Sequence, residues 1–224
     1  MTRLLFINPN TTVSMTAKIE LAARDAAPAG VQADAMTSPF GPTSIQGPED
    51  DAAAVPGLLE ALKEGIEQDY DGFAIACFDD TGLDECRALT DKPVIGIGQA
   101  AFHTAALLSQ SFSVVTTLAI SVPVIEVNLI RYGLAAACKR VRASDVPVLA
   151  LEEPGSAAQE RVSQEIADAI KHDDCNAIVL GCAGMAPLAT QLSIEHKIPV
   201  IDGVVCACAL LSQMHDLRRS LTLT

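Results

Sequence analysis

The chain has 224 residues, half of them hydrophobic, with few aromatic residues and no tryptophan. This composition supports a packed core of aliphatic side chains and excludes general disorder. The net charge of −13 repels phosphate backbones and anionic membrane surfaces, so we expect neither nucleic acid nor a membrane as a partner.

Short apolar runs alternate along the chain with helical patterns, which is the order expected for βαβ units and a parallel sheet. The predicted strands cover residues 3–8, 31–36, 72–77, 93–97, 112–117, 146–151, 176–181 and 198–202. The predicted helices cover residues 11–27, 50–68, 82–89, 99–109, 121–136, 156–172, 186–194 and 204–216.

The predicted elements repeat in the two halves of the chain. Strand 3–8 corresponds to 112–117, strand 31–36 corresponds to 146–151, and two further pairs follow in the same order. The repeat predicts an α/β fold of two pseudo-symmetric lobes, each with a four-stranded, mainly parallel sheet flanked by helices, and an active site in the cleft between the lobes. We assign residues 1–97 and 203–224 to lobe 1 and residues 98–202 to lobe 2.

Two cysteines occupy matching positions in this repeat. Cys77 ends one apolar run and Cys182 follows its counterpart. Ligands of open parallel sheets bind at the carboxyl ends of the strands, so we expect a thiol on each wall of one cleft. The turns and helix starts that follow favour a thiolate, which suits general acid–base chemistry. A structural role as small buried side chains stays open for both.

The remaining candidate residues favour simpler roles. The other five cysteines form no scaffold-like spacing, which agrees with a cytoplasmic location. Two of them, Cys86 and Cys138, fall within helical patterns. Asp79 and Asp80 beside the first thiol either position a substrate amide or cap the next helix. Neither a zinc-type spacing nor a phosphate-binding glycine loop occurs, so we expect no metal and no nucleotide cofactor.

Three motifs follow one another along the chain: Ile7-Asn8-Pro9-Asn10-Thr11-Thr12, Ala76-Cys77-Phe78-Asp79-Asp80-Thr81-Gly82-Leu83-Asp84 and Gly181-Cys182-Ala183-Gly184-Met185. In these motifs and their order, the chain resembles the aspartate/glutamate/hydantoin racemase superfamily, and hydantoin racemases most closely. The resemblance extends from residue 3 to residue 215.

The resemblance implies a cofactor-independent racemase whose catalytic residues are Cys77 and Cys182, and it implies a homo-oligomer. The loop Ser44–Gly47 is similar to the one that closes over the substrate. Phe78-Asp79 stands where aspartate and glutamate racemases usually carry Asn-Thr, which disfavours a free amino acid. The residues matched to the family's substrate pocket are Asn8, Ile45, Gln46, Phe78, Asp79, Thr116, Thr117, Ala183 and Gly184.

We therefore expect racemisation of 5-monosubstituted hydantoins by a two-base 1,1-proton transfer between the two thiols. The partner is a small cyclic ureide, with no cofactor and no metal. Allantoin racemase is the alternative function. A further alternative, from another class, is a non-catalytic protein that binds a small molecule or senses oxidants through its thiols.

Overall fold

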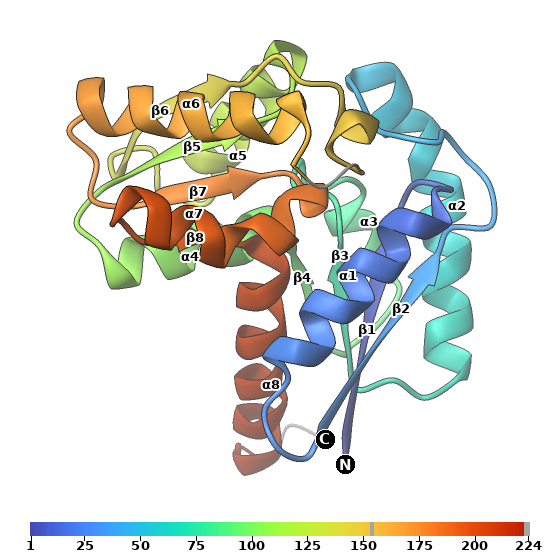
Figure 1. Cartoon of the computed structure of the whole chain (residues 1–224). Coiled ribbons are helices and arrows are strands. Elements are labelled where there is room, and N and C mark those ends of the chain that lie inside the picture. The colour runs from blue at the N-terminus through green and yellow to red at the C-terminus, as the bar shows by residue number, and fades with distance from the viewer. Residues whose placement is uncertain (153–154, 222–224) are drawn as a thin grey trace.

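The computed structural model describes residues 1–152 and 155–221 and contains two four-stranded sheets (Figure 1). The strand orders are β2-β1-β3-β4 and β6-β5-β7-β8, and every neighbouring pair is parallel. The second sheet therefore repeats the topology of the first, which confirms the predicted fold class and the two-lobe arrangement.

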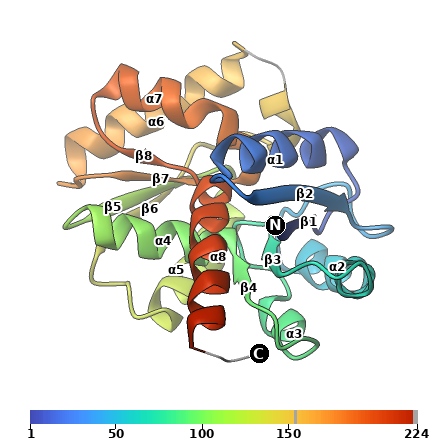
Figure 2. The ribbon, with the colours of Figure 1, turned by 90° about the horizontal axis from the view of Figure 1, so that it is seen from below.

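The elements follow one another in the alternating order that the sequence predicts. The first sheet and its helices comprise β1 (Thr2–Asn8), α1 (Val13–Ala26), β2 (Val31–Thr37), α2 (Pro48–Glu67), β3 (Gly72–Ile75), α3 (Leu83–Arg87) and β4 (Val94–Gly96). The second comprises α4 (Ile97–Leu108), β5 (Phe112–Thr116), η1 (Ala119–Ser121), α5 (Val122–Arg131), β6 (Cys138–Ala143), η2 (Val148–Glu152), α6 (Ala157–His172), β7 (Ile178–Gly181), η3 (Ala183–Leu188), α7 (Ala189–His196) and β8 (Val200–Ile201). Helix α8 (Gly203–Ser220) ends the fold and lies beside α4 and the first sheet (Figure 2).

Side chains of the central strands alternate between two apolar layers. In β1, Leu4 and Phe6 belong to the core formed with α1, α4 and α8, whereas Leu5 and Ile7 pack against α2 and α3. Both faces are covered by helices, which explains why these strands are continuous apolar runs and not alternating ones. The core on the α4 and α8 side also includes Val114 of β5, so one hydrophobic cluster joins the two lobes.

One predicted strand is wrong. Residues 146–151 form no strand, and 3-10 helix η2 begins there at Val148. The edge strand of the second sheet is instead β6, Cys138–Ala143. Cys138 therefore lies in a strand, and not in a helix as the sequence had indicated. The run 146–151 is apolar because Val146 and Leu151 are buried in the core with α6 and Val148 is buried in the core that joins the lobes. Apolar runs alone do not distinguish strands from other buried segments. Strand β6 carries exposed charged residues, as edge strands commonly do.

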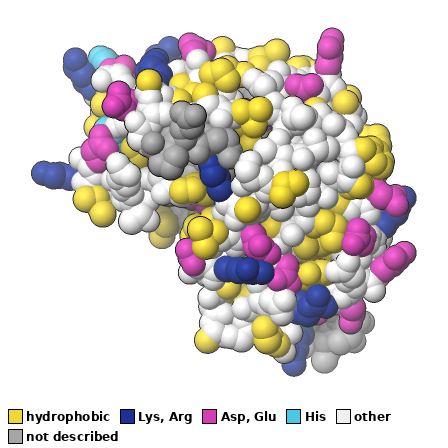
Figure 3. All heavy atoms as spheres, turned by 45° about the vertical axis from the view of Figure 1, so that its right-hand side comes forward, with side chains coloured by type: hydrophobic (Ala, Val, Ile, Leu, Met, Phe, Trp, Pro, Cys, Tyr) yellow, Lys and Arg dark blue, Asp and Glu magenta, His cyan; other side chains and the backbone are white. Residues whose placement is uncertain are grey.

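Helix α5 is shorter than predicted. It ends at Arg131, before Gly133 takes a left-handed conformation with φ of 73°. None of the helices among the described residues is long and apolar enough to span a bilayer. Acidic and basic side chains are interspersed over the face drawn in Figure 3, in agreement with a dispersed negative charge.

Candidate active site

The two cysteines leave the same position of the two sheets. Strand β3 and its counterpart β7 each lie third in their sheet, and Cys77 and Cys182 follow their carboxyl ends. The pairing of β3 with β1 continues to Ala76, whose N–H donates to the carbonyl of Ile7 at 2.8 Å. After that hydrogen bond the chain turns, so Cys77 lies beyond the end of the sheet.

The carboxyl end of β7 packs closely against β5. The Thr116 hydroxyl donates to the carbonyl of Gly181 at 2.9 Å, and a Cβ on Gly181 would lie only 2.6 Å from that of Thr116. This close packing of β5 against β7 accepts only glycine directly before Cys182.

Both thiols line one cavity of about 40 Å³. That volume is small, and Ile45 of the loop Ser44–Gly47 forms part of its wall. The lining residues are Asn10, Met15, Ile45, Ala76, Cys77, Phe78, Asp79, Thr117, Ser121, Val148, Gly181, Cys182 and Ala183.

Burial opposes ionisation of both thiols. Burial, followed by the charge of Asp79, raises the pKa of Cys77 well above its usual value. Burial also raises the pKa of Cys182 to about 11, against hydrogen bonds from the N–H groups of Gly184 and Met185. The expectation that local N–H groups ease thiolate formation is therefore met only in part, because desolvation has the larger effect.

Asp79 is a second titratable group of the cavity. Burial raises its pKa to about 7, while a hydrogen bond from the Ser121 hydroxyl at 3.3 Å acts in the opposite direction. Its backbone carbonyl accepts from Asn128 at 2.8 Å, so residues of the second half of the chain hold it in place. The carboxyl group is available to a ligand at close to neutral pH.

Asp80 has a structural role. Its carboxylate accepts from the N–H groups of Gly98 and Gln99, at 2.9 and 2.8 Å, and from the Tyr132 hydroxyl at 2.7 Å. It therefore holds the first turn of α4, not the helix that follows it in sequence.

Five of the predicted substrate-binding residues line the cavity: Ile45, Phe78, Asp79, Thr117 and Ala183. Phe78 also packs edge-to-face against Phe102, with ring centroids 5.2 Å apart. This contact packs the ring into the core that joins the lobes, so Phe78 forms an apolar wall beside Cys77.

Four predicted residues lie outside the lining. Asn8 is fully buried and donates to the Asn10 carboxamide at 2.9 Å, so it acts through Asn10. The Thr116 hydroxyl is hydrogen-bonded to the carbonyl of Gly181 at the end of β7. The Gln46 carboxamide donates to the Ser44 hydroxyl at 2.6 Å. Gly184 lies next to the thiol of Cys182, since a Cβ on Gly184 would lie 3.6 Å from that sulfur.

The sequence interpretation missed six lining residues, which are Asn10, Met15, Ala76, Ser121, Val148 and Gly181. Asn10 lies within the first motif but is not among the residues that the resemblance matches to the substrate pocket. Ser121 and Val148 belong to 3-10 segments that were assigned to a helix and a strand. Their one sequence signal is their position just after the carboxyl ends of strands.

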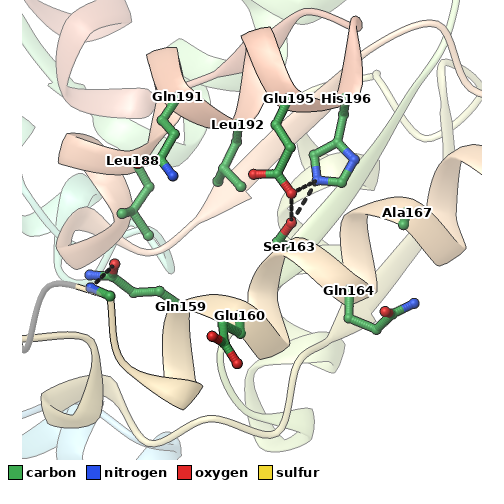
Figure 4. Close-up of a pocket in the computed structure, with 11 residues that line it drawn as sticks. Gln159, Glu160, Ser163, Gln164, Ala167, Leu188, Gln191, Leu192, Glu195 and His196 are labelled. Carbon is green, nitrogen blue, oxygen red and sulfur yellow. Dashed lines mark hydrogen bonds and ion pairs between the residues drawn. The ribbon is translucent and has the colours of Figure 1, made fainter.

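A larger groove of about 500 Å³ lies between α6 and α7, away from the thiols (Figure 4). The Ser163 hydroxyl contacts Glu195 at 2.6 Å and Nε2 of His196 at 2.8 Å. Glu195 also approaches Nε2, at 3.6 Å, and not the far nitrogen, so these groups do not form a serine–histidine–acid triad. These hydrogen bonds link α6 to α7.

No group of three or more metal-binding side chains capable of holding an ion is found within residues 1–152 and 155–221. The family model of Asp/Glu/Hydantoin racemase matches residues 4–211. The chain belongs to the Asp/Glu/Hydantoin racemase family. This finding confirms the resemblance seen in the three motifs.

Individual relatives share this assignment over most of their length. A hydantoin racemase from Rhizobium meliloti is 46% identical over 201 residues, which are 90% of this chain and 83% of the relative. The structure of allantoin racemase from Klebsiella pneumoniae matches with a TM-score of 0.94 and 43% identity, over 97% of this chain and 89% of that one. The structure of allantoin racemase from Pseudomonas fluorescens matches with a TM-score of 0.92 and 36% identity, over 96% of this chain and 92% of that one. The protein is an isomerase of the racemase kind.

Proposed function

We propose that this protein racemises 5-monosubstituted hydantoins by a two-base 1,1-proton transfer, with Cys77 and Cys182 as the acid and the base. The observation that supports this most is the pair of thiols, from matching strand ends, on one cavity. One thiolate removes the C5 proton from one face of the ring, and the other thiol donates a proton to the opposite face. The roles reverse for the other enantiomer.

The hydantoin ring makes this chemistry accessible to thiols alone. The carbanion at C5 delocalises into the adjacent ring carbonyl as an enolate, so charge develops on that oxygen. Thr117 lies at the end of β5 on the cavity wall and is the proposed donor to it, as Thr116 is already engaged by Gly181. One such donor is typically worth ~3–4 kcal/mol in the transition state.

Asp79 is the proposed partner of a ring N–H group. Its carboxyl group lines the cavity and makes one side-chain hydrogen bond, from Ser121. A carboxylate oxygen accepts an N–H of a cyclic ureide, whereas a free α-amino acid brings a carboxylate that Asp79 repels. Ile45, Phe78 and Val148 supply the apolar wall for the C5 substituent.

Allantoin racemisation is the second candidate, because two of the matching structures are allantoin racemases. Allantoin is a hydantoin with a ureido group at C5, and the Asn10 carboxamide offers the cavity a polar contact. Comparing kcat/KM for pure enantiomers of allantoin and 5-benzylhydantoin distinguishes the candidates. A preference of tenfold or more for allantoin overturns the alkyl- or arylhydantoin assignment.

Both thiols are required by this mechanism. We expect Cys77→Ser and Cys182→Ser each to lower racemisation by about 10²–10⁴-fold, because a serine hydroxyl is a far weaker acid than a thiol. Polarimetry on an optically pure 5-substituted hydantoin measures the loss. Each variant still exchanges the C5 proton of one enantiomer with deuterated solvent, since one base remains.

Cys138→Ser is the matched control, because Cys138 starts β6 and does not line the cavity. It retains wild-type activity, and EDTA leaves the rate unchanged. Near wild-type racemisation by either cavity variant excludes the two-base mechanism. Ligand binding by the wild type without turnover of any hydantoin supports the non-catalytic alternative.

A further inference from the structure

Helix α5, which follows β5 of the second sheet, holds the turn that carries Cys77. Asn128 of α5 is only 6% exposed, and its carboxamide donates to the backbone carbonyl of Asp79 at 2.8 Å. At the end of the same helix, the Tyr132 hydroxyl donates to the carboxylate of Asp80 at 2.7 Å. Residues four apart in a helix lie on one face, so these two donors act together on two consecutive residues of the turn.

Further contacts with the turn come from the same region. Ser121, directly before α5, donates to the Asp79 carboxylate at 3.3 Å. The Tyr132 ring packs against Phe102 of α4, with ring centroids 6.4 Å apart, and Phe102 meets Phe78 edge-to-face. Side chains of α4 and of the α5 region therefore contact three successive residues after the first thiol.

The far end of the turn is attached to the first lobe. The Thr81 hydroxyl donates to the carboxylate of Asp51, in the first turn of α2, at 2.5 Å. The turn thus lies between an attachment to α2 and an attachment to α5. Cys182 follows β7 of the second sheet, so the placement of Cys77 opposite that thiol depends on the contacts with α5.

The corresponding contact in the other half of the fold is apolar. Helix α1 lies against η3, the segment after Cys182, as α5 lies against the turn after Cys77. Counted from the first residue of each helix, Ile19 of α1 stands where Asn128 stands in α5. Ile19 is fully buried in the core that contains Ala183, and its side chain has no hydrogen-bonding group. The two walls are thus held differently, by hydrogen bonds on one side and by apolar packing at the matching place on the other.

We propose that Asn128 and Tyr132 are positioning residues, which fix the turn of Cys77 to the second sheet so that the two thiols face opposite sides of one ligand. Ile125 of α5 is fully buried in the same core as Val114 of β5, so the helix itself is anchored beside that sheet. Neither positioning residue lines the cavity, and both act through the turn. This inference rests on the proposed racemase function.

The placement of Cys77 decides the fate of an enolate that Cys182 forms. As the Cys182 thiolate removes the C5 proton, the C–H bond breaks, an S–H bond forms and the electron pair delocalises into the ring carbonyl. A correctly placed Cys77 donates to the opposite face, and the product is inverted. With Cys77 displaced, the Cys182 thiol exchanges its proton with deuterated solvent and returns a deuteron to the original face. The substrate is then labelled without inversion.

The test compares inversion with deuterium labelling of the remaining substrate, at initial rates in deuterated buffer, by chiral chromatography and mass spectrometry. For Tyr132→Phe and Asn128→Leu we expect labelling per inversion to rise at least fivefold for one enantiomer, the one that Cys77→Ser still exchanges. For the other enantiomer, whose proton Cys77 removes, inversion slows and the ratio stays constant. Val127→Ala, on the exposed side of α5, leaves rates and ratios unchanged.

Two results overturn the positioning role. If the rates fall while labelling per inversion stays at the wild-type value for both enantiomers, Asn128 and Tyr132 only stabilise the fold. If the variant that combines both substitutions keeps its rates and ratios within twofold of wild type, the turn is held without α5.

A second measurement does not depend on turnover. Amide hydrogen exchange of the wild type and of Asn128→Leu is followed by mass spectrometry of peptides that contain residues 77–82 or residues 183–188. We expect exchange at least fivefold faster in the first segment and unchanged in the second. Equal acceleration in both segments, or in neither, overturns the local role. Faster exchange in the first segment alone, with a wild type that is inactive on every hydantoin, preserves the positioning role and refutes only the proposed function.

Discussion

Asp79 lies where one charge influences both thiols. Its negative charge raises the pKa of Cys77 and of Cys182, in each case after the larger effect of burial. The pKa of Asp79 itself is raised to about 7. Below pH 7 the carboxyl group is neutral, and above pH 7 it ionises and makes both thiolates less favourable. Ionisation of Asp79 therefore limits the thiolate population on the alkaline side of neutrality.

Removing the negative charge of Asp79 should change the reactivity of both thiols in a direction that can be measured. Asp79→Asn keeps the volume of the side chain and lowers the pKa of both thiols, so alkylation of the cavity thiols by iodoacetamide at pH 8.5 rises about tenfold. The same variant raises KM for a hydantoin, because the carboxylate that accepts the ring N–H is replaced by a neutral and weaker carboxamide acceptor. Serine variants at residue 77 or 182 assign the labelled thiol. Unchanged alkylation would show that Asp79 exerts no charge effect on the thiols.

At the scale of elements, the strands that carry the thiols were predictable and the edge of the second sheet was not. β3 and β7 are short, fully buried runs bounded by turns, so their sequence and their environment agree. β6 is amphipathic and charged, and its role in the sheet depends on β5 beside it. The same reason explains why Ser121 and Val148 were missed, since their positions in the site depend on tertiary packing.

The start of α4 depends on a distant side chain. Asp80 accepts from two N–H groups of the first turn of α4, and a Cβ on Gly96 would lie 1.9 Å from its carboxylate. We expect Asp80→Ala to lower the free energy of unfolding by about 2 kcal/mol, as the loss of a helix cap does. Urea denaturation followed by circular dichroism measures this change. Asp91→Ala, in a loop away from α4, serves as the control with little change; equal stability of the two variants would contradict this role for Asp80.

At the scale of the whole molecule, an uncharged apolar face is exposed over α4, α7 and α8. Leu107, Leu108 and Ile194 are 81%, 72% and 74% exposed. They line a groove of about 670 Å³ whose only ionisable carboxyl group, that of Asp202, is buried. Two copies of a chain with a net charge of −13 repel each other elsewhere, so this face is the proposed contact of a homo-oligomer.

The mass of the native protein tests this assembly. Light scattering after size-exclusion chromatography should give a multiple of 23.4 kDa for the wild type. Introducing charge with Leu108→Glu and Ile194→Glu should shift the mass toward one chain, because the carboxylates remain unpaired in the contact. Leu21→Glu, on the exposed side of α1, is the matched control. A wild-type mass of one chain rejects the oligomer, and an unchanged mass in the double variant places the contact on another face.

The duplicated topology has a stereochemical consequence. A mirror plane relates the two enantiomers of a hydantoin, and no protein of L-amino acids contains a mirror plane. In the proposed mechanism, however, a pseudo-twofold rotation presents equivalent strand ends to the top and the bottom of a flat enolate. Under that proposal, duplication of a chiral half provides near-equal access to both faces, and residual differences between the two halves decide which hand is processed faster.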